Sequence, residues 1–151
     1  MTRANVNRLV FADTGFWIAL YDSTDQYHPV ATGIMDQLAL GTFLFPWPLY
    51  YELLRTRFVR RAGWVESFRT VIRQQRIKIT DDIAYRDRAL YQTMEGTNIG
   101  KHGRRNISLV DMVIRLVLED PQQRIGELVT FNVADFADVC AKRGIPIRSS
   151  V

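Results

Sequence analysis

Four acidic side chains stand where the sequence predicts the ends of strands or the beginnings of helices. Asp13 follows the first apolar strand, and Glu52 begins a helix after the second strand. Asp111 lies in the first turn of an apolar helix, whereas Asp135 follows a later strand, just after Asn132. The carboxyl ends of parallel strands meet at one edge of a sheet, and ligands bind there. We therefore expect these oxygen-bearing side chains to form one site.

The chemistry of such a site follows from its charge. Two carboxylates about 5 Å apart repel by roughly 3 kcal/mol at an effective dielectric near 20, so the cluster needs a cation or must take up protons. Cys140 is the one cysteine, and neither histidine is suitably placed. Oxygen ligands alone favour Mg²⁺ or Mn²⁺ over Zn²⁺. Such an ion suits hydrolysis of a phosphodiester bond, because it polarises the phosphate and lowers the pKa of an attacking water.

The basic residues are consistent with a polyanionic substrate. The formal charge is +4, the pI is about 9.5, and arginine greatly outnumbers lysine. The planar arginine fork suits phosphate oxygens better than a lysine does. The residues that we expect to contact RNA are Arg55, Arg57, Arg104 and Arg105.

Each acid also has a purely structural interpretation, through helix capping or ion pairing. Asp13 could simply cap the helix after it, and Asp135 could be a favourable negative charge at a helix N-terminus. Glu52 could pair with Arg55. Asp111 could belong to a Ser108-x-x-Asp111 capping pattern or pair with Arg115.

Strands and helices alternate along the chain, which predicts an α/β fold with helices on both faces of a parallel sheet, a three-layer α/β/α sandwich. We expect all of residues 1–151 to form one domain. The predicted strands are 9–12, 42–45, 76–79 and 128–131, with 145–148 ending the sheet; the predicted helices are 16–21, 29–40, 49–61, 64–75, 80 or 81 to 95, 108–119 and 134–143, and 96–106 is a loop.

Several other classes of protein are disfavoured. No apolar run approaches the roughly 20 residues needed to cross a bilayer, and the N-terminal segment lacks the form of a signal peptide. A single cysteine excludes an intramolecular disulfide. We therefore expect a cytoplasmic protein without membrane association. The sequence also contains no Walker loop, dinucleotide fingerprint or Gly-x-Ser-x-Gly elbow.

Four motifs in register resemble the PIN-domain family, particularly its VapC-type toxins. Phe-Ala-Asp-Thr-Gly-Phe at 11–16 is similar to the opening of these domains, and Pro-Leu-Tyr-Tyr-Glu-Leu-Leu-Arg at 48–55 to the helix with the second acid. Ser-Leu-Val-Asp at 108–111 resembles the helix with the third acid, and Thr-Phe-Asn-Val-Ala-Asp-Phe at 130–136 the closing strand and turn. The resemblance covers nearly the whole chain.

The resemblance implies a five-stranded parallel sheet and an acidic pocket that binds Mg²⁺ or Mn²⁺ for RNA cleavage. It further implies a small antitoxin partner and a homodimer, since many family members have both. Carried over to this chain, Asp13, Glu52 and Asp111 form the metal-binding core. The other implied positions are Thr14 and Ser108 as secondary polar contacts, Asp135 as the fourth carboxylate, and Asn132 as a neutral ligand or donor.

The leading hypothesis is an endoribonuclease toxin of a toxin–antitoxin pair. The same chemistry could instead serve RNA maturation or turnover without an antitoxin. A third possibility is a non-catalytic module that binds RNA or protein. Asn132 favours it because some family members have an acid there, and so does Arg115, which would compete with a metal if its guanidinium reached Asp111.

Overall fold

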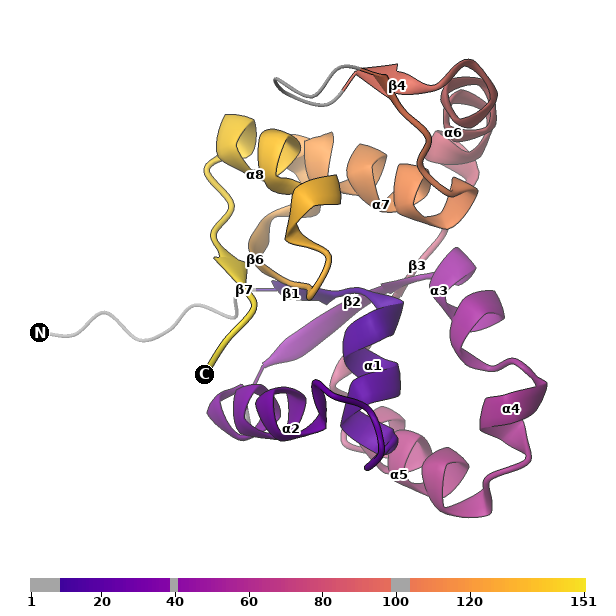
Figure 1. Cartoon of the computed structure of the whole chain (residues 1–151), viewed down its shortest axis with the longest axis vertical. Coiled ribbons are helices and arrows are strands. Elements are labelled where there is room, and N and C mark those ends of the chain that lie inside the picture. The colour runs from indigo at the N-terminus through magenta and orange to yellow at the C-terminus, as the bar shows by residue number, and fades with distance from the viewer. Residues whose placement is uncertain (1–8, 39–40, 99–103) are drawn as a thin grey trace, which may run out of the picture.

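The computed structural model describes residues 9–38, 41–98 and 104–151, with the backbone alone at 97–98 and 104–105. Its centre is a five-stranded, all-parallel sheet in the order β3-β2-β1-β6-β7 (Figure 1). The strands are β1 (Leu9–Ala12), β2 (Thr42–Pro46), β3 (Ile77–Thr80), β6 (Ile125–Val129) and β7 (Ile147–Arg148).

Helices cover both faces of this sheet, which confirms the predicted three-layer α/β/α arrangement. In Figure 1, α1, α2 and α5 lie below the sheet, and α6, α7 and α8 lie above it. The helices are α1 (Thr14–Tyr21), α2 (His28–Gln37), α3 (Trp47–Leu53), α4 (Thr56–Val59), α5 (Ala62–Arg73), α6 (Ile83–Glu95), α7 (Leu109–Glu119) and α8 (Ala137–Arg143), with 3-10 turns η2 (Pro121–Gln123) and η3 (Val133–Asp135).

The central elements are apolar because they are enclosed on all sides. β1 has neighbours on both edges and helices on both faces, and its last three residues are buried, as expected of a central parallel strand. Seven consecutive residues of α7, from Met112 to Leu118, are also buried. These two elements carry Asp13 and Asp111 at their ends, so the rigid core fixes the backbone positions of both acids.

Aromatic rings form the core between the sheet and the lower layer of helices. Trp17 of α1 is fully buried, and its ring centroid lies 5.0 Å from that of Phe43 and 5.6 Å from that of Phe45. Phe68 of α5 lies 5.7 Å away on another side of the indole. This cluster anchors α1, whose N-terminus begins at the predicted site, against β2.

One predicted helix is wrong: residues 49–61 do not form a continuous helix. α3 ends at Leu53, Arg55 is extended (φ −74°, ψ 169°), and α4 then begins. The reason lies in the apolar spacing. Leu53 and Phe58 are both buried, but residues five apart in an unbroken helix point about 140° from one another. The break turns Phe58 back into the core.

Several other boundaries differ from the prediction. The helix expected over 134–143 begins only at Ala137, because Val133–Asp135 form the 3-10 turn η3. β6 covers Ile125–Val129 rather than 128–131, because its partner β1 ends at Ala12, opposite Val129. The predicted loop 96–106 contains a two-stranded antiparallel sheet, in which β4 (Thr97–Asn98) pairs with β5 (Arg104–Arg105).

Within the described ranges, none of the helices combines the length and the apolar character that a transmembrane segment needs.

Replacing Trp17 tests this account of the core. We expect Trp17→Ala to lower the free energy of unfolding by about 3–5 kcal/mol, since it removes a large side chain enclosed by aromatic rings. Val59 of α4, which is 50% exposed, serves as the control, and Val59→Ala should change stability by less than about 0.5 kcal/mol. Urea denaturation measures both. Equal effects of the two substitutions would contradict the packing described.

Candidate active site

Asp13 lies between the end of β1 and the start of α1. Its Oδ1 atom accepts a hydrogen bond from the amide of Phe16 at 3.1 Å, so it is the N-cap of α1. Its Oδ2 atom accepts one from Thr130 Oγ1. Burial raises the pKa of the Asp13 carboxyl to about 6, and the nearby Glu52 adds to this effect, although the hydrogen bonds from Thr130 and Phe16 oppose it. Capping and a functional role are therefore compatible.

Glu52 reaches the same region from α3. Its Oε2 atom accepts a hydrogen bond of 2.6 Å from the hydroxyl of Thr14, which is the first residue of α1. The bond ties the N-terminus of α1 to the second acid. In the described part of the chain, no ion pair or hydrogen bond joins Glu52 to Arg55, so the structural pairing considered from the sequence does not form.

Asp111 lies in the first turn of α7, where Ser108 is the N-cap. The Ser108 hydroxyl accepts a hydrogen bond from the Asp111 amide at 3.1 Å, which confirms the capping pattern. Burial raises the pKa of the Asp111 carboxyl to about 6, and the negative charges of Glu52, Asp13 and Asp135 raise it further. Asp111 thus lies within electrostatic range of the other three acids, from three separate segments of the chain.

The fourth acid sits in the turn after β6. Asp135 is buried in η3, and its Oδ2 atom accepts a hydrogen bond from Asn132 Nδ2. The backbone amide of Asn132 donates a hydrogen bond to Thr130 Oγ1 at 3.0 Å. Both positions considered for the fourth ligand therefore belong to one hydrogen-bonded turn.

Thr130 is a residue of this site that the sequence interpretation missed. Its fully buried side chain donates to Asp13 and accepts from the Asn132 amide, so it links the first acid to the turn that carries the fourth. The available signal was its position, because it directly follows the last residue of β6 at the edge of the sheet where the acids lie.

Arg115 does not pair with Asp111. Its guanidinium donates to both carboxylate oxygens of Asp138, at 2.7 and 2.8 Å, and to the backbone carbonyl of Asp135 at 2.7 Å. The concern that Arg115 competes for a metal at Asp111 is therefore wrong, because Asp138, which the sequence interpretation did not consider, is its partner.

The chemistry of these side chains fits a hard divalent ion, since the potential ligands are carboxylate oxygens together with the amide oxygen of Asn132. Their spacing is more open than that of a loaded site: among the described residues, no three histidine, cysteine or acidic side chains converge closely enough to hold an ion. The raised pKa values of Asp13 and Asp111 show that these carboxyls lie where negative charge is disfavoured, which a cation would relieve.

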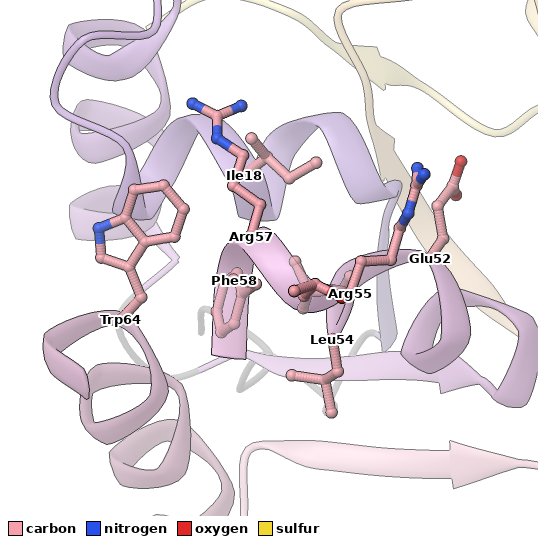
Figure 2. Close-up of a pocket in the computed structure, with 9 residues that line it drawn as sticks. Ile18, Glu52, Leu54, Arg55, Arg57, Phe58 and Trp64 are labelled. Carbon is pink, nitrogen blue, oxygen red and sulfur yellow. The ribbon is translucent and has the colours of Figure 1, made fainter. Parts of the chain in front are cut away.

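A pocket of about 620 Å³ opens beside Glu52, between α1, the α3–α4 break and α5. In Figure 2, Glu52 and Arg55 line one end of the pocket and Trp64 lines the other. Arg57 lies between them and forms an ion pair of 2.6 Å with Asp22, although its side chain is 67% exposed. The floor is apolar, with Ile18, Leu53, Leu54 and Phe58 among its lining residues.

The other two arginines expected to contact RNA are Arg104 and Arg105. Their backbone forms β5, which leads directly to the N-terminus of α7. Their side chains lie outside the described part of the structure.

Comparison of the chain with solved structures identifies its fold as that of VapC-type PIN-domain toxins, as the sequence resemblance implied. One similar structure is VapC20 of Mycobacterium tuberculosis, described as a toxin that cleaves the sarcin-ricin loop; it has a TM-score of 0.61 and 20% sequence identity, over 85% of this chain and 94% of that one. Another is VapBC2 of Rickettsia felis bound to a promoter DNA fragment, with a TM-score of 0.54 and 14% identity over 95% and 99% of the two chains. Neither models of protein families nor curated protein sequences match this chain.

The raised pKa values predict how stability depends on pH. Between the ordinary pKa of 3.8 and about 6, Asp13 and Asp111 bind more protons in the folded than in the unfolded protein. Their contribution to stability is therefore full below about pH 4 and is lost as the pH rises through 6. The matched variant is Asp13→Asn, which keeps a capping oxygen but cannot ionise. In EDTA, we expect the free energy of unfolding of the parent protein to fall between pH 4.5 and 7 by about 1–3 kcal/mol more than that of this variant.

Urea titrations at several pH values measure this difference. The acids with lowered pKa values, among them Asp22 and Asp120, act below pH 4 and do not interfere. Parallel pH profiles of the parent protein and Asp13→Asn would show that Asp13 is ionised throughout this range.

Proposed function

We propose that the chain is a metal-dependent endoribonuclease that hydrolyses RNA phosphodiester bonds. Asp13, Glu52, Asp111 and Asp135 hold Mg²⁺ or Mn²⁺ in this proposal, with Asn132 as a neutral ligand or donor. The observation that carries it is that hydrogen bonds link the segments bearing these acids. Thr14 at the start of α1 donates to Glu52 of α3, and Thr130 donates to Asp13 and accepts from the turn that holds Asp135. Burial raises the pKa of Asp111, and the charges of the other three acids raise it further. Groups that serve only as helix caps do not need to face one another.

The ion, when bound, would polarise a phosphate oxygen and acidify an attacking water. The residues of the chain prepare the site for it. Thr130 and the Phe16 amide hold the two oxygens of Asp13 in fixed directions, and Thr14 does the same for one oxygen of Glu52. Ser108 fixes the first turn of α7, on which Asp111 lies. Such hydrogen bonds preorganise carboxylate ligands and lower the cost of closing them on an ion.

The pocket beside Glu52 offers a path for the RNA backbone. Arg55 lines the same end of this pocket as Glu52 (Figure 2) and can bind a phosphate that neighbours the scissile one. Arg57 is held by Asp22, so its charge contributes to the field of the pocket more than to a direct fork. Arg104 and Arg105 remain proposed RNA contacts, on the segment that leads to Asp111.

The fold favours a toxin over other ribonucleases. VapC20 is described as a toxin that cleaves the sarcin-ricin loop, and VapBC2 as bound to a DNA fragment from its promoter. We propose by analogy that this chain is a single-domain, cytoplasmic toxin held inactive by a small cognate antitoxin. Expression should arrest cell growth, and co-expression of the adjacent small gene should restore it; a ribonuclease of RNA maturation or turnover would show neither effect.

A non-catalytic RNA- or protein-binding module is the second candidate. Asn132 at one of the two possible positions of the fourth acid is its remaining support, because Arg115 is bound to Asp138 and does not neutralise Asp111. Since Asp135 occupies the same turn as Asn132, the acidic set is complete without an acid at 132. This favours the catalytic proposal.

Substitution of the acids tests the activity. With Mn²⁺ present, we expect the protein to cleave RNA, EDTA to stop the cleavage, and Asp13→Asn or Asp111→Asn to slow it about 100-fold or more, because each removes a charged ligand. Cleavage of a mixed RNA pool, followed by electrophoresis, measures the rates. Asp36→Asn, which neutralises an exposed acid of α2, should leave the rate unchanged.

Cleavage that persists in EDTA, or that Asp111→Asn and Asp36→Asn affect equally, would contradict the metal-dependent mechanism. Intact RNA under all conditions would favour the non-catalytic module.

We also propose a homodimer, formed through α3 and α6. Several large apolar side chains of these helices are exposed, namely Trp47, Tyr51, Ile83, Leu90, Tyr91 and Met94. Large exposed apolar surfaces are uncommon on monomers. Analytical ultracentrifugation should give twice the mass of 17.5 kDa, and Tyr51→Asp combined with Tyr91→Asp should shift the protein to a monomer. A parent protein that sediments as a monomer at micromolar concentration would exclude the dimer.

A further inference from the structure

Arg115 is the one charged side chain within the seven consecutive buried residues of α7. It lies on the same helix as Asp111, one turn further from the edge of the sheet that carries the acids. Only the arginine of its ion pair is buried, because the side chain of its partner Asp138 is 31% exposed. Removing the guanidinium charge from water costs free energy that the attraction to Asp138 only partly returns, so the pair is a poor source of stability. An apolar residue, such as those on either side of it, would fill this position of the helix without that cost.

The three hydrogen bonds of the guanidinium join different parts of the protein. Two go to the carboxylate of Asp138 in the first turn of α8, and the third goes to the carbonyl of Asp135, the last residue of η3. One rigid planar group on α7 therefore holds both the end of the 3-10 turn and the beginning of the helix after it.

This segment is otherwise short of regular structure. η3 has three residues, and the hydrogen bonds from the amides of Asp135 and Phe136 that form it measure 3.3 and 3.1 Å. The side chain of Asp135 is oriented by Asn132, and Asn132 in turn by Thr130. Arg115 fixes the backbone of the same residue from the opposite end. Asn132 and Thr130 therefore hold Asp135 from the side of β6, and Arg115 holds it from the side of α7.

We propose that Arg115, with Asp138, is a positioning residue that fixes the fourth carboxylate relative to Asp111. It touches neither the metal nor the RNA, and it acts through the backbone of Asp135. This inference rests on the proposed function, in which Asp135 is a metal ligand. Outer hydrogen bonds of this kind, when removed, commonly weaken metal affinity by 10–100-fold.

Calorimetric titration with Mn²⁺ tests the proposal. We expect Arg115→Met, which keeps an unbranched buried side chain, to weaken Mn²⁺ binding about tenfold, and Arg115→Lys to weaken it less. The matched control is Arg148→Met, which breaks the pair that Arg148 forms with Glu127 at 2.9 Å, away from the acidic residues. This control should bind Mn²⁺ like the parent protein.

The decisive comparison is made in an Asp135→Asn background. If Arg115 acts through Asp135, adding Arg115→Met to Asp135→Asn should cause no further loss of affinity, because coupled residues are not additive. An equal tenfold loss in both backgrounds, or unchanged affinity in Arg115→Met alone, overturns the proposal. If Arg115→Met does not fold, Asp138→Asn, which keeps the shape of the side chain, takes its place in the same comparison.

A second measurement needs no metal. Hydrogen exchange at the backbone amides of Asp135 and Phe136 should be faster in Arg115→Met than in the parent protein and in the control Arg148→Met. Amides in the centre of β1 should exchange at the same rate in all three proteins. A parent protein that binds no Mn²⁺ would contradict the proposed function, and the exchange would then decide the positioning role by itself. Unchanged exchange at both amides would overturn it.

Discussion

Burial of acidic side chains that the fold holds near one another is the constraint on which the rest of the structure depends. Asp13 directly follows the central strand, and Asp111 lies in the first turn of the buried helix, so close packing holds both backbones near the other acids. Burial removes the water that would screen their charges, and the pKa values of both carboxyls rise to about 6. At neutral pH this arrangement stores unfavourable electrostatic energy that a divalent cation would release.

The local hydrogen bonds make sense in this light. Three of the four acids accept a hydrogen bond from an uncharged side chain: Asp13 from Thr130, Glu52 from Thr14 and Asp135 from Asn132. A positive partner in their place would neutralise a carboxylate and compete with a cation for it. Arg115 reaches this turn, but its guanidinium pairs with Asp138 and contacts only the backbone carbonyl of Asp135. The acidic site therefore keeps its negative charge while its geometry is fixed.

Much of the fold could be predicted from the sequence, because apolar periodicity and chain reversals are local signals. The strand before Asp13 and the helix after Ser108 are confirmed where they were expected. The break at Arg55 could not be foreseen, since it follows from the burial of Phe58 against residues distant in sequence. The roles of Thr130 and of the Arg115–Asp138 pair were missed for the same reason: their partners lie 117 and 23 residues away, and a single sequence gives no signal for such pairs.

A crystal structure of the protein grown with Mn²⁺ tests the central claim most directly, through the anomalous signal of the metal. The account predicts an ion coordinated by carboxylate oxygens of Asp13 and Asp111, with Glu52 and the turn containing Asp135 drawn in around it. Mn²⁺ bound elsewhere, or these acids unchanged and without an ion at a saturating concentration, would contradict it.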